Sequence, residues 1–221
     1  DGGDDAASGA EVGILHDDND RRERGGVSLY VPEHWDPSAR WPLVVALHGG
    51  SGHGADFLWT WLREARSRGF LVLSPTAVDD TWSLLMPQLD GDRLAAMVEH
   101  VATTWNVDRS RVLLTGISDG ATFSLCYGLR EGTPFTHLAP ISGVLAPLDP
   151  RDRAGAVDKP IYLVHGALDW MFPVAIARMA HRELERWGAQ VTYREIEDLS
   201  HTYPREENAR ILEWMDRRLA R

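Results

Sequence analysis

The 221-residue chain has little of several features that small proteins use to hold themselves together or to bind other molecules. Its single cysteine, Cys126, excludes an internal disulfide framework and a cysteine-rich zinc site. No apolar run approaches the roughly 18 residues that a membrane-spanning helix needs. Basic residues number 23 against 33 acidic ones, and the formal charge of −10 disfavours nucleic acid and anionic lipid as partners. The composition therefore predicts one compact domain around its own apolar core.

The start of the chain lacks the pattern of a targeting segment. Residues 1–10 are small and acidic rather than basic and then apolar, so we expect no signal peptide in them, while a leader cleaved upstream stays open. Charged residues continue to about position 24. We therefore predict a flexible acidic lead-in over residues 1–24 and a single domain over residues 25–221. The lone thiol favours a cytoplasmic location, with an exported mature form as the alternative.

Short apolar runs alternate with longer amphipathic segments from residue 26 onward. The runs expected to form strands are residues 27–31, 43–47, 70–73, 111–115, 137–141, 161–164 and 191–196. The segments expected to form helices are residues 57–65, 94–105, 176–184 and 211–219. This alternation is typical of an α/β fold, a mostly parallel sheet with helices on both faces. Ligands of such sheets bind beyond the carboxyl ends of the strands, so the loops at that edge are the candidate sites.

The turn after residues 43–47 is rich in glycine and reads His-Gly-Gly-Ser-Gly-His-Gly-Ala over residues 48–55. Part of it fits the G-x-G-x-x-G/A fingerprint of dinucleotide-binding proteins. That fingerprint also needs an acidic residue about twenty positions later, at the end of the next strand, where this chain has Ser-Pro-Thr. A glycine cluster here can instead bring backbone N–H groups close to a reacting carbonyl, or simply form a tight turn.

A second strand-to-helix turn carries the pattern G-x-S-x-G, as Gly-Ile-Ser-Asp-Gly over residues 116–120. An expected strand precedes it and an apolar segment follows, which is the context of a nucleophile elbow. The flanking glycines leave room for a sharp turn that exposes the serine hydroxyl at the sheet edge. Ser118 is therefore the candidate nucleophile.

A serine hydroxyl needs a positioned base, which is itself oriented by a third group. Asp169 follows the strand expected at 161–164, and His201 follows the strand expected at 191–196. Both loops lie at the same predicted edge as Ser118, in the order serine, acid, histidine. Asp198 is an alternative acid on the histidine's own loop. We interpret His137 and His181 as satisfied or solvated histidines. His48 and His165 precede glycines at strand ends, and we interpret them as structural donors that hold the turns, with a more direct role in the site as the alternative.

These segments resemble the α/β-hydrolase fold, and within it the phospholipase/carboxylesterase family, close to the polyhydroxybutyrate-depolymerase-like and feruloyl-esterase-like esterases. The resemblance spans about residues 27–219. It implies that Ser118 is the nucleophile, His201 the base and acid, and Asp169 its orienting group. It also implies an oxyanion hole made by the backbone N–H groups of Gly50 and Asp119. Members of the family usually carry glycine at two positions where this chain has Ala121 and Ser200.

The expected function is hydrolysis of small or medium carboxylic esters through an acyl-enzyme, with the ester and water as partners and with no metal or organic cofactor. Four aromatic residues in loops at the predicted edge are candidates for the substrate pocket: Trp82, Trp170, Phe172 and Tyr203. About twenty residues separate the strands expected at 137–141 and 161–164, which leaves little material for a lid. A thioesterase or acyltransferase on the same residues and a non-catalytic binding module are the alternatives.

Overall fold

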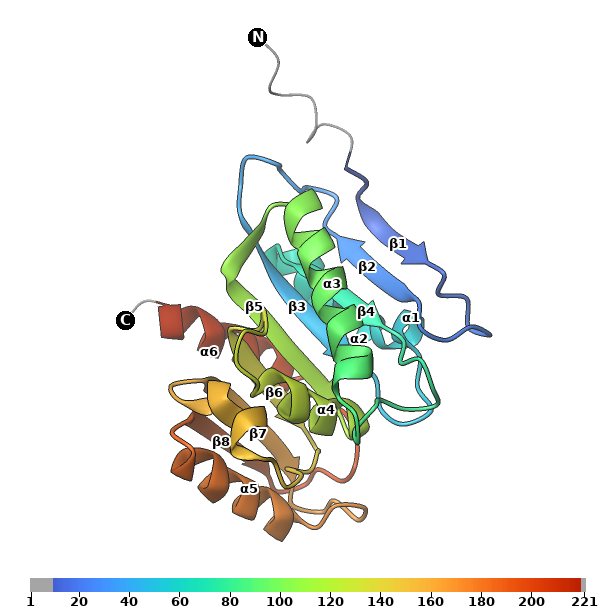
Figure 1. Cartoon of the computed structure of the whole chain (residues 1–221). Coiled ribbons are helices and arrows are strands. Elements are labelled where there is room, and N and C mark those ends of the chain that lie inside the picture. The colour runs from blue at the N-terminus through green and yellow to red at the C-terminus, as the bar shows by residue number, and fades with distance from the viewer. Residues whose placement is uncertain (1–9, 220–221) are drawn as a thin grey trace.

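The computed structural model describes residues 10–219 and contains an eight-stranded sheet in the order β1-β2-β4-β3-β5-β6-β7-β8 (Figure 1). The strands are β1 (Gly13–Asp17), β2 (Val27–Val31), β3 (Trp41–Leu47), β4 (Leu71–Pro75), β5 (Val107–Ile117), β6 (His137–Ile141), β7 (Pro160–Gly166) and β8 (Gln190–Ile196). The helices are α1 (Gly54–Phe57), α2 (Trp59–Arg68), α3 (Gln88–Thr104), α4 (Asp119–Gly128), α5 (Val174–Arg186) and α6 (Glu207–Leu219), with a 3₁₀ segment at Pro150–Ala156. Strands β3 to β8 are parallel, and β1 and β2 pair in the antiparallel sense. The expected mostly parallel α/β architecture is confirmed.

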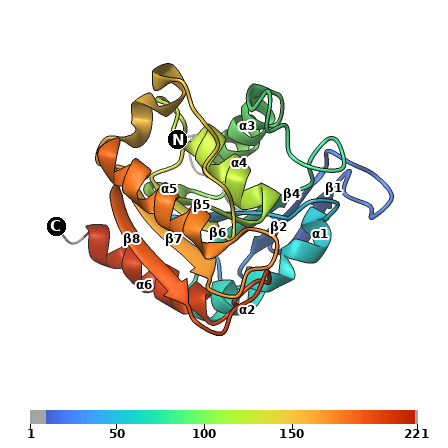
Figure 2. The same cartoon turned by 90° about the horizontal axis from the view of Figure 1, so that it is seen from below.

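Helices cover both faces of the sheet (Figure 2). Helices α3, α4 and α5 pack on one face, and α2 and α6 pack on the other. Successive residues of β3 therefore face opposite cores: Leu43 and Val45 point to the first, and Val44 points to the second. All three are fully buried, which explains the continuous apolar run in the sequence.

Strand β1 lies inside the segment that the sequence predicted as a flexible lead-in. It adds to the antiparallel edge by pairing with β2, with Ile14 opposite Tyr30 and Leu15 opposite Leu29. Only these two consecutive residues of β1 are strongly apolar, so the alternation that identifies a strand is too short to detect. The boundary expected at residue 25 therefore falls after the sheet has begun. Residues 1–9 of the predicted lead-in lie outside the described part of the chain.

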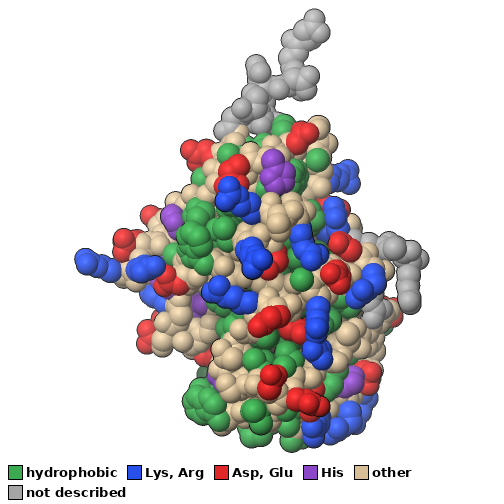
Figure 3. All heavy atoms as spheres, turned by 180° about the vertical axis from the view of Figure 1, so that it is seen from behind, with side chains coloured by type: hydrophobic (Ala, Val, Ile, Leu, Met, Phe, Trp, Pro, Cys, Tyr) green, Lys and Arg blue, Asp and Glu red, His purple; other side chains and the backbone are tan. Residues whose placement is uncertain are grey.

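Within residues 10–219, no helix combines the length and apolar character needed to cross a membrane. The face of the molecule in Figure 3 carries acidic and basic side chains interspersed. On that face, no continuous basic field is present to attract a phosphate backbone.

Candidate active site

Ser118 lies between the end of β5 and the start of α4, in a backbone conformation that is rare for a side-chain-bearing residue. Its φ is 54° and its ψ is −118°, and its N–H donates to the carbonyl of Ile141 at 3.0 Å. A Cβ at Gly116 would lie 2.8 Å from the backbone of Gly120, and one at Gly120 would lie 2.5 Å from the carbonyl oxygen of His48. Both contacts are with backbone, so the two glycines permit the sharp turn that the sequence motif predicted.

His201 lies between the other two candidate residues. Its Nδ1 is 2.8 Å from Oδ2 of Asp169, and its Nε2 is 3.1 Å from Oγ of Ser118. The Asp169 side chain is fully buried, and that of His201 is 10% exposed. The carboxylate can only accept, so Nδ1 carries the hydrogen and Nε2 is left to accept the serine proton. This arrangement joins three loops that follow β5, β7 and β8.

The surroundings of Asp169 favour its ionised form. Burial opposes ionisation, but hydrogen bonds from the N–H groups of Phe172 and Met171, together with the bond from His201, outweigh it and hold the pKa of the carboxyl below its ordinary value. The two backbone bonds reach Oδ1 at 2.8 and 2.9 Å, and Oδ2 remains for His201. The alternative acid, Asp198, is exposed, and the His201 ring turns to Asp169 instead.

The glycine-rich turn after β3 lies directly against the start of α4. A Cβ at Gly50 would be 2.9 Å from Oδ2 of Asp119, and one at Gly49 would be 3.7 Å from Cβ of Ser118. Asp119 is the first residue of α4, where backbone N–H groups have no partner within the helix. In the described part of the chain, no hydrogen bond is donated by the N–H of Gly50 or Asp119. The two predicted oxyanion-hole residues therefore lie next to one another, and their role in holding an oxyanion stays a prediction.

His48 holds this turn in place through hydrogen bonds at both of its ring nitrogens. Its Nε2 accepts from the N–H of Ala77 at 3.0 Å, so the hydrogen lies on Nδ1, which donates to the carbonyl of Gly49 at 2.6 Å. Burial lowers the pKa of His48 to about 4, which keeps the ring neutral.

Sequence reasoning missed a second link: the hydroxyl of Thr81 donates to Oδ2 of Asp119 at 2.6 Å. Thr81 stands in a loop without a motif, and no local pattern identifies it.

The four predicted pocket residues divide into two pairs. Trp170 is 73% exposed, and the rings of Trp170 and Phe172 meet the His201 ring edge-on at centroid distances of 6.2 and 5.3 Å. Trp82, by contrast, is 3% exposed and donates from Nε1 to the carbonyl of His48. Trp82 therefore belongs to the core beneath α4, where its ring packs against Phe123, and nothing in its surroundings supports the expected pocket role.

Tyr203 is half-buried and contacts α6 and the segment Gly54–Phe57. Its hydroxyl donates to Oδ1 of Asn208 at 2.7 Å, and its ring packs edge-on against Phe57 at 5.5 Å. Burial raises the pKa of the phenol well above its ordinary value. Tyr203, which is half-buried, thus links the histidine loop to the helices beneath it, and its expected pocket role stays a prediction. Two of the other histidines that the sequence analysis discussed contact groups elsewhere: His181 pairs with Glu185, and His137 contacts Thr136.

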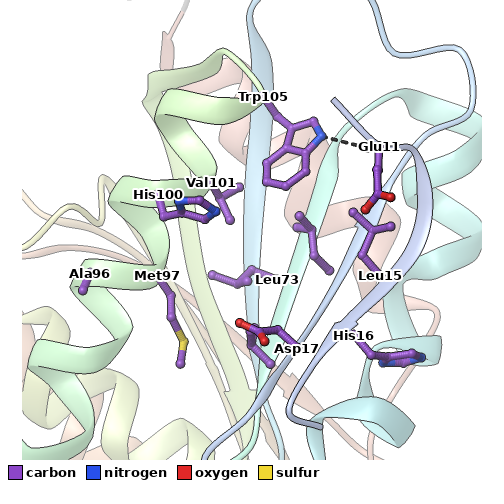
Figure 4. A pocket seen from close by; sticks show the side chains of 12 residues that line it. Glu11, Leu15, His16, Asp17, Leu73, Ala96, Met97, His100, Val101 and Trp105 are labelled. Atoms are coloured by element: carbon purple, nitrogen blue, oxygen red, sulfur yellow. Dashed lines mark hydrogen bonds between the residues drawn. The ribbon is translucent and has the colours of Figure 1, made fainter. Parts of the chain in front are cut away.

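A hollow of about 510 Å³ lies between the β1 edge and α3 (Figure 4). Its floor includes Leu73 and Val101, and Trp105 closes one end with Nε1 donating to the carbonyl of Glu11. None of the predicted site residues lines it, so it is separate from the serine. No three His, Cys, Asp or Glu side chains within residues 10–219 are grouped as a metal site requires.

The sheet order, the strained serine and the convergence of the three loops define an α/β-hydrolase. The chain belongs to the phospholipase/carboxylesterase family, whose sequence profile matches residues 91–218. An acetylxylan esterase of Coprinopsis cinerea is 29% identical over 108 residues, 43% of this chain and 29% of the relative. A bifunctional acetylxylan esterase/xylanase of Neocallimastix patriciarum is 26% identical over 56% of this chain and 19% of its own length. The chain thus matches less than a third of either curated relative.

Solved structures show the same fold at low identity. The esterase PE8 is 19% identical with a TM-score of 0.71, covering 93% of this chain and 99% of its own. The acetyl xylan esterase from Aspergillus awamori is 17% identical with a TM-score of 0.70, covering 94% and 99%. The Bacillus cereus carboxylesterase is 17% identical with a TM-score of 0.66, covering 86% and 93%. At these identities the likeness is one of fold.

Proposed function

We propose that the protein hydrolyses small or medium carboxylic esters with Ser118 as nucleophile, His201 as general base and acid, and Asp169 as its orienting group. The observation that carries the proposal is the position of His201, which reaches Asp169 Oδ2 at 2.8 Å and Ser118 Oγ at 3.1 Å. A weak hydroxyl nucleophile is activated by this arrangement, because the proton has an acceptor and the acceptor is held in one tautomer.

The reaction proceeds in two halves. Ser118 Oγ attacks the ester carbonyl carbon while His201 Nε2 takes its proton, and the carbonyl oxygen becomes an anion. The N–H groups of Gly50 and Asp119 hold that anion, each contributing about 3 kcal/mol to the transition state. The alcohol leaves with the proton from His201, and an acyl group remains on Ser118. Water, deprotonated by His201, then attacks the acyl carbon, and the carboxylic acid leaves as the serine regains its proton.

The open surroundings of the site support small or medium substrates. The segment between β6 and β7 contains only the 3₁₀ turn Pro150–Ala156, and Trp170 beside His201 remains 73% exposed. The Trp170 and Phe172 rings offer apolar surface to an acyl or aryl group. The three named acetylxylan esterases support an acetyl group as the acyl part and a carbohydrate as the alcohol part.

A fluorophosphonate probe tests the nucleophile. We expect covalent labelling of Ser118, abolished in Ser118→Ala and retained in Ser67→Ala, a serine on the exposed side of α2. Labelling that persists in Ser118→Ala contradicts the proposal, and no labelling of the native chain favours a binding module instead.

A substrate panel tests the acyl and leaving groups. We expect faster turnover of p-nitrophenyl acetate and acetylated xylan than of long-chain esters, acyl thioesters or methyl ferulate. A higher kcat/KM on thioesters reassigns the protein to thioester hydrolysis on the same residues, and dominant transfer of the acyl group to an added alcohol reassigns it to acyl transfer.

A further inference from the structure

His165 is a buried histidine that the proposed reaction does not use. It stands next to the last residue of β7, four residues before Asp169, and its side chain is fully buried. Its Nε2 lies 2.7 Å from the carbonyl oxygen of Phe172 and 3.4 Å from Oδ2 of Asp169. That carboxylate oxygen is also the one that His201 contacts.

The partners of His165 determine which of its nitrogens carries the hydrogen. The Phe172 carbonyl can only accept, so Nε2 of His165 bears the N–H and Nδ1 bears a lone pair. Nδ1 is buried and has no hydrogen-bond partner within the described residues. The ring is therefore held through Nε2, and both groups that Nε2 faces, the Phe172 carbonyl and Oδ2 of Asp169, belong to the same loop.

The loop after β7 is closed by two sets of hydrogen bonds. On one side, the N–H groups of Met171 and Phe172 donate to Oδ1 of Asp169. On the other side, the Phe172 carbonyl accepts from His165. Phe172 thus joins the buried ring to the carboxylate: its N–H fixes Oδ1, and its carbonyl is fixed by the sheet. Movement of Phe172 would turn Oδ2 away from His201.

The neighbouring loop leaves this turn little room. A Cβ at Gly166 would lie 2.2 Å from the carbonyl oxygen of Leu199, so β7 ends in close contact with the segment just before His201. The N–H of Leu168 also donates to Leu199 O at 3.0 Å. The loops of the acid and the base are therefore packed backbone to backbone, and His165 lies beneath the acid's loop.

We propose that His165 is a positioning residue that, through the Phe172 carbonyl, aims the Asp169 carboxylate at His201, with its hydrogen on Nε2 and none on Nδ1. The inference rests on the proposed function, because it concerns the alignment of the same three residues. Misplacement of a reacting group by about 1 Å can cost on the order of 100-fold in rate. Loss of the His165 N–H should therefore lower kcat while KM stays nearly constant.

Two substitutions at His165 distinguish the effect of its Nε2–H hydrogen bond from the effect of the space that its ring fills. In His165→Gln, the side-chain amide can donate from nearly the same position as Nε2, whereas His165→Phe fills the space without a donor. We expect kcat to fall at least about tenfold in His165→Phe and to be largely retained in His165→Gln. The same variants should differ in the low-field proton resonance of the His201–Asp169 hydrogen bond, present with Gln and weakened or broadened with Phe. His181→Gln on α5, whose ring pairs with Glu185, is the matched histidine control.

A measurement on the native chain keeps the inference testable if His165→Phe does not fold. Nitrogen-15 NMR of the imidazoles should show His165 with a protonated Nε2 and an unprotonated Nδ1. A hydrogen on Nδ1 overturns the inference, as does equal kcat in His165→Phe and the native chain. If Ser118→Ala abolishes turnover while both His165 variants are unaffected, only this inference fails. If Ser118→Ala leaves turnover unchanged, the proposed function fails.

Discussion

The glycines around Ser118 show how single residues determine the geometry of the site. A Cβ added at Gly120 would lie 2.5 Å from the carbonyl oxygen of His48. The start of α4 therefore packs directly against the glycine-rich turn. Gly50 of that turn in turn lies against the Asp119 side chain, with an added Cβ 2.9 Å from Oδ2. One steric constraint therefore holds the serine turn against the residues proposed to form the oxyanion hole.

The charge state of two residues determines how the rate depends on pH. Asp169 has a pKa below its ordinary value, so it is ionised at any pH where an imidazole titrates. The rate should therefore fall with decreasing pH as His201 alone takes up a proton and can no longer accept one from Ser118. We expect the acidic limb of kcat/KM, measured from pH 4 to 9, to have the slope of one proton. A profile without an acidic limb removes His201 from this role.

The same lowered pKa links Asp169 to folding. Its ionisation stabilises the folded chain at neutral pH, and that contribution is lost as the pH falls through the folded-state pKa, below the ordinary value of 3.8.

Asp169→Asn keeps the shape of the side chain and removes its charge. We expect kcat/KM to fall on the order of 10⁴-fold, because an amide can favour the wrong tautomer of His201. Asp198→Asn, an exposed position on the histidine's own loop, is the matched control and should stay within about twofold of the native rate. The reverse result would identify Asp198 as the acid.

At the scale of elements, the parallel strands β3, β5, β7 and β8 bring four loops to one edge, where the candidate site lies (Figure 1). The loop after β8 is connected to α2 through a residue of α6. Tyr203 of that loop donates to Asn208 on α6, and Asn208 donates to the carbonyl of Thr60 on α2 at 2.7 Å. Asn208 is fully buried, so its amide depends on both partners.

Substitution of Tyr203 tests this link. Tyr203→Phe removes one hydrogen bond and leaves Oδ1 of Asn208 unpaired, so we expect the free energy of unfolding to fall by about 1–2 kcal/mol while KM is unchanged. Trp170→Ala should do the opposite, raising KM severalfold without lowering the melting temperature, because Trp170 is mostly exposed. Thermal unfolding and steady-state kinetics on both variants distinguish the roles. A raised KM in Tyr203→Phe would return Tyr203 to the pocket.

At the scale of the whole molecule, the fold begins before residue 25. The segment before residue 25 contains β1 and also Asn19. The buried amide of Asn19 donates to Ser28 Oγ and accepts from Thr76 Oγ1. The sheet without β1 would expose the edge of β2, whose backbone groups would then lack partners.

Two shortened chains test how far the domain extends. A chain starting at residue 25 should melt at least about 5 °C below one starting at residue 10, because it loses both the β1 pairing and the Asn19 hydrogen bonds. Calorimetry of the two chains measures the difference. Equal melting temperatures would support the domain boundary that the sequence predicted.

The sequence by itself determined the features that depend on local periodicity. The expected strands at residues 27–31 and 137–141 have the same bounds as β2 and β6, because buried strands show as short, mostly apolar runs. The glycine spacing around Ser118 likewise determined the turn, since a close backbone approach excludes any Cβ there. The chain order of Ser118, Asp169 and His201 followed from the strand each residue succeeds.

The tertiary structure alone decided which side chains meet. Ser118 and His201 are 83 positions apart, and their contact depends on the order of strands in the sheet rather than on any local pattern. The same long-range packing placed Trp82 in the interior, joined Tyr203 to Asn208, and joined His165 to the loop of Asp169. The type of a residue determines which groups it can bind. Which group it meets depends on how elements from distant parts of the chain pack together.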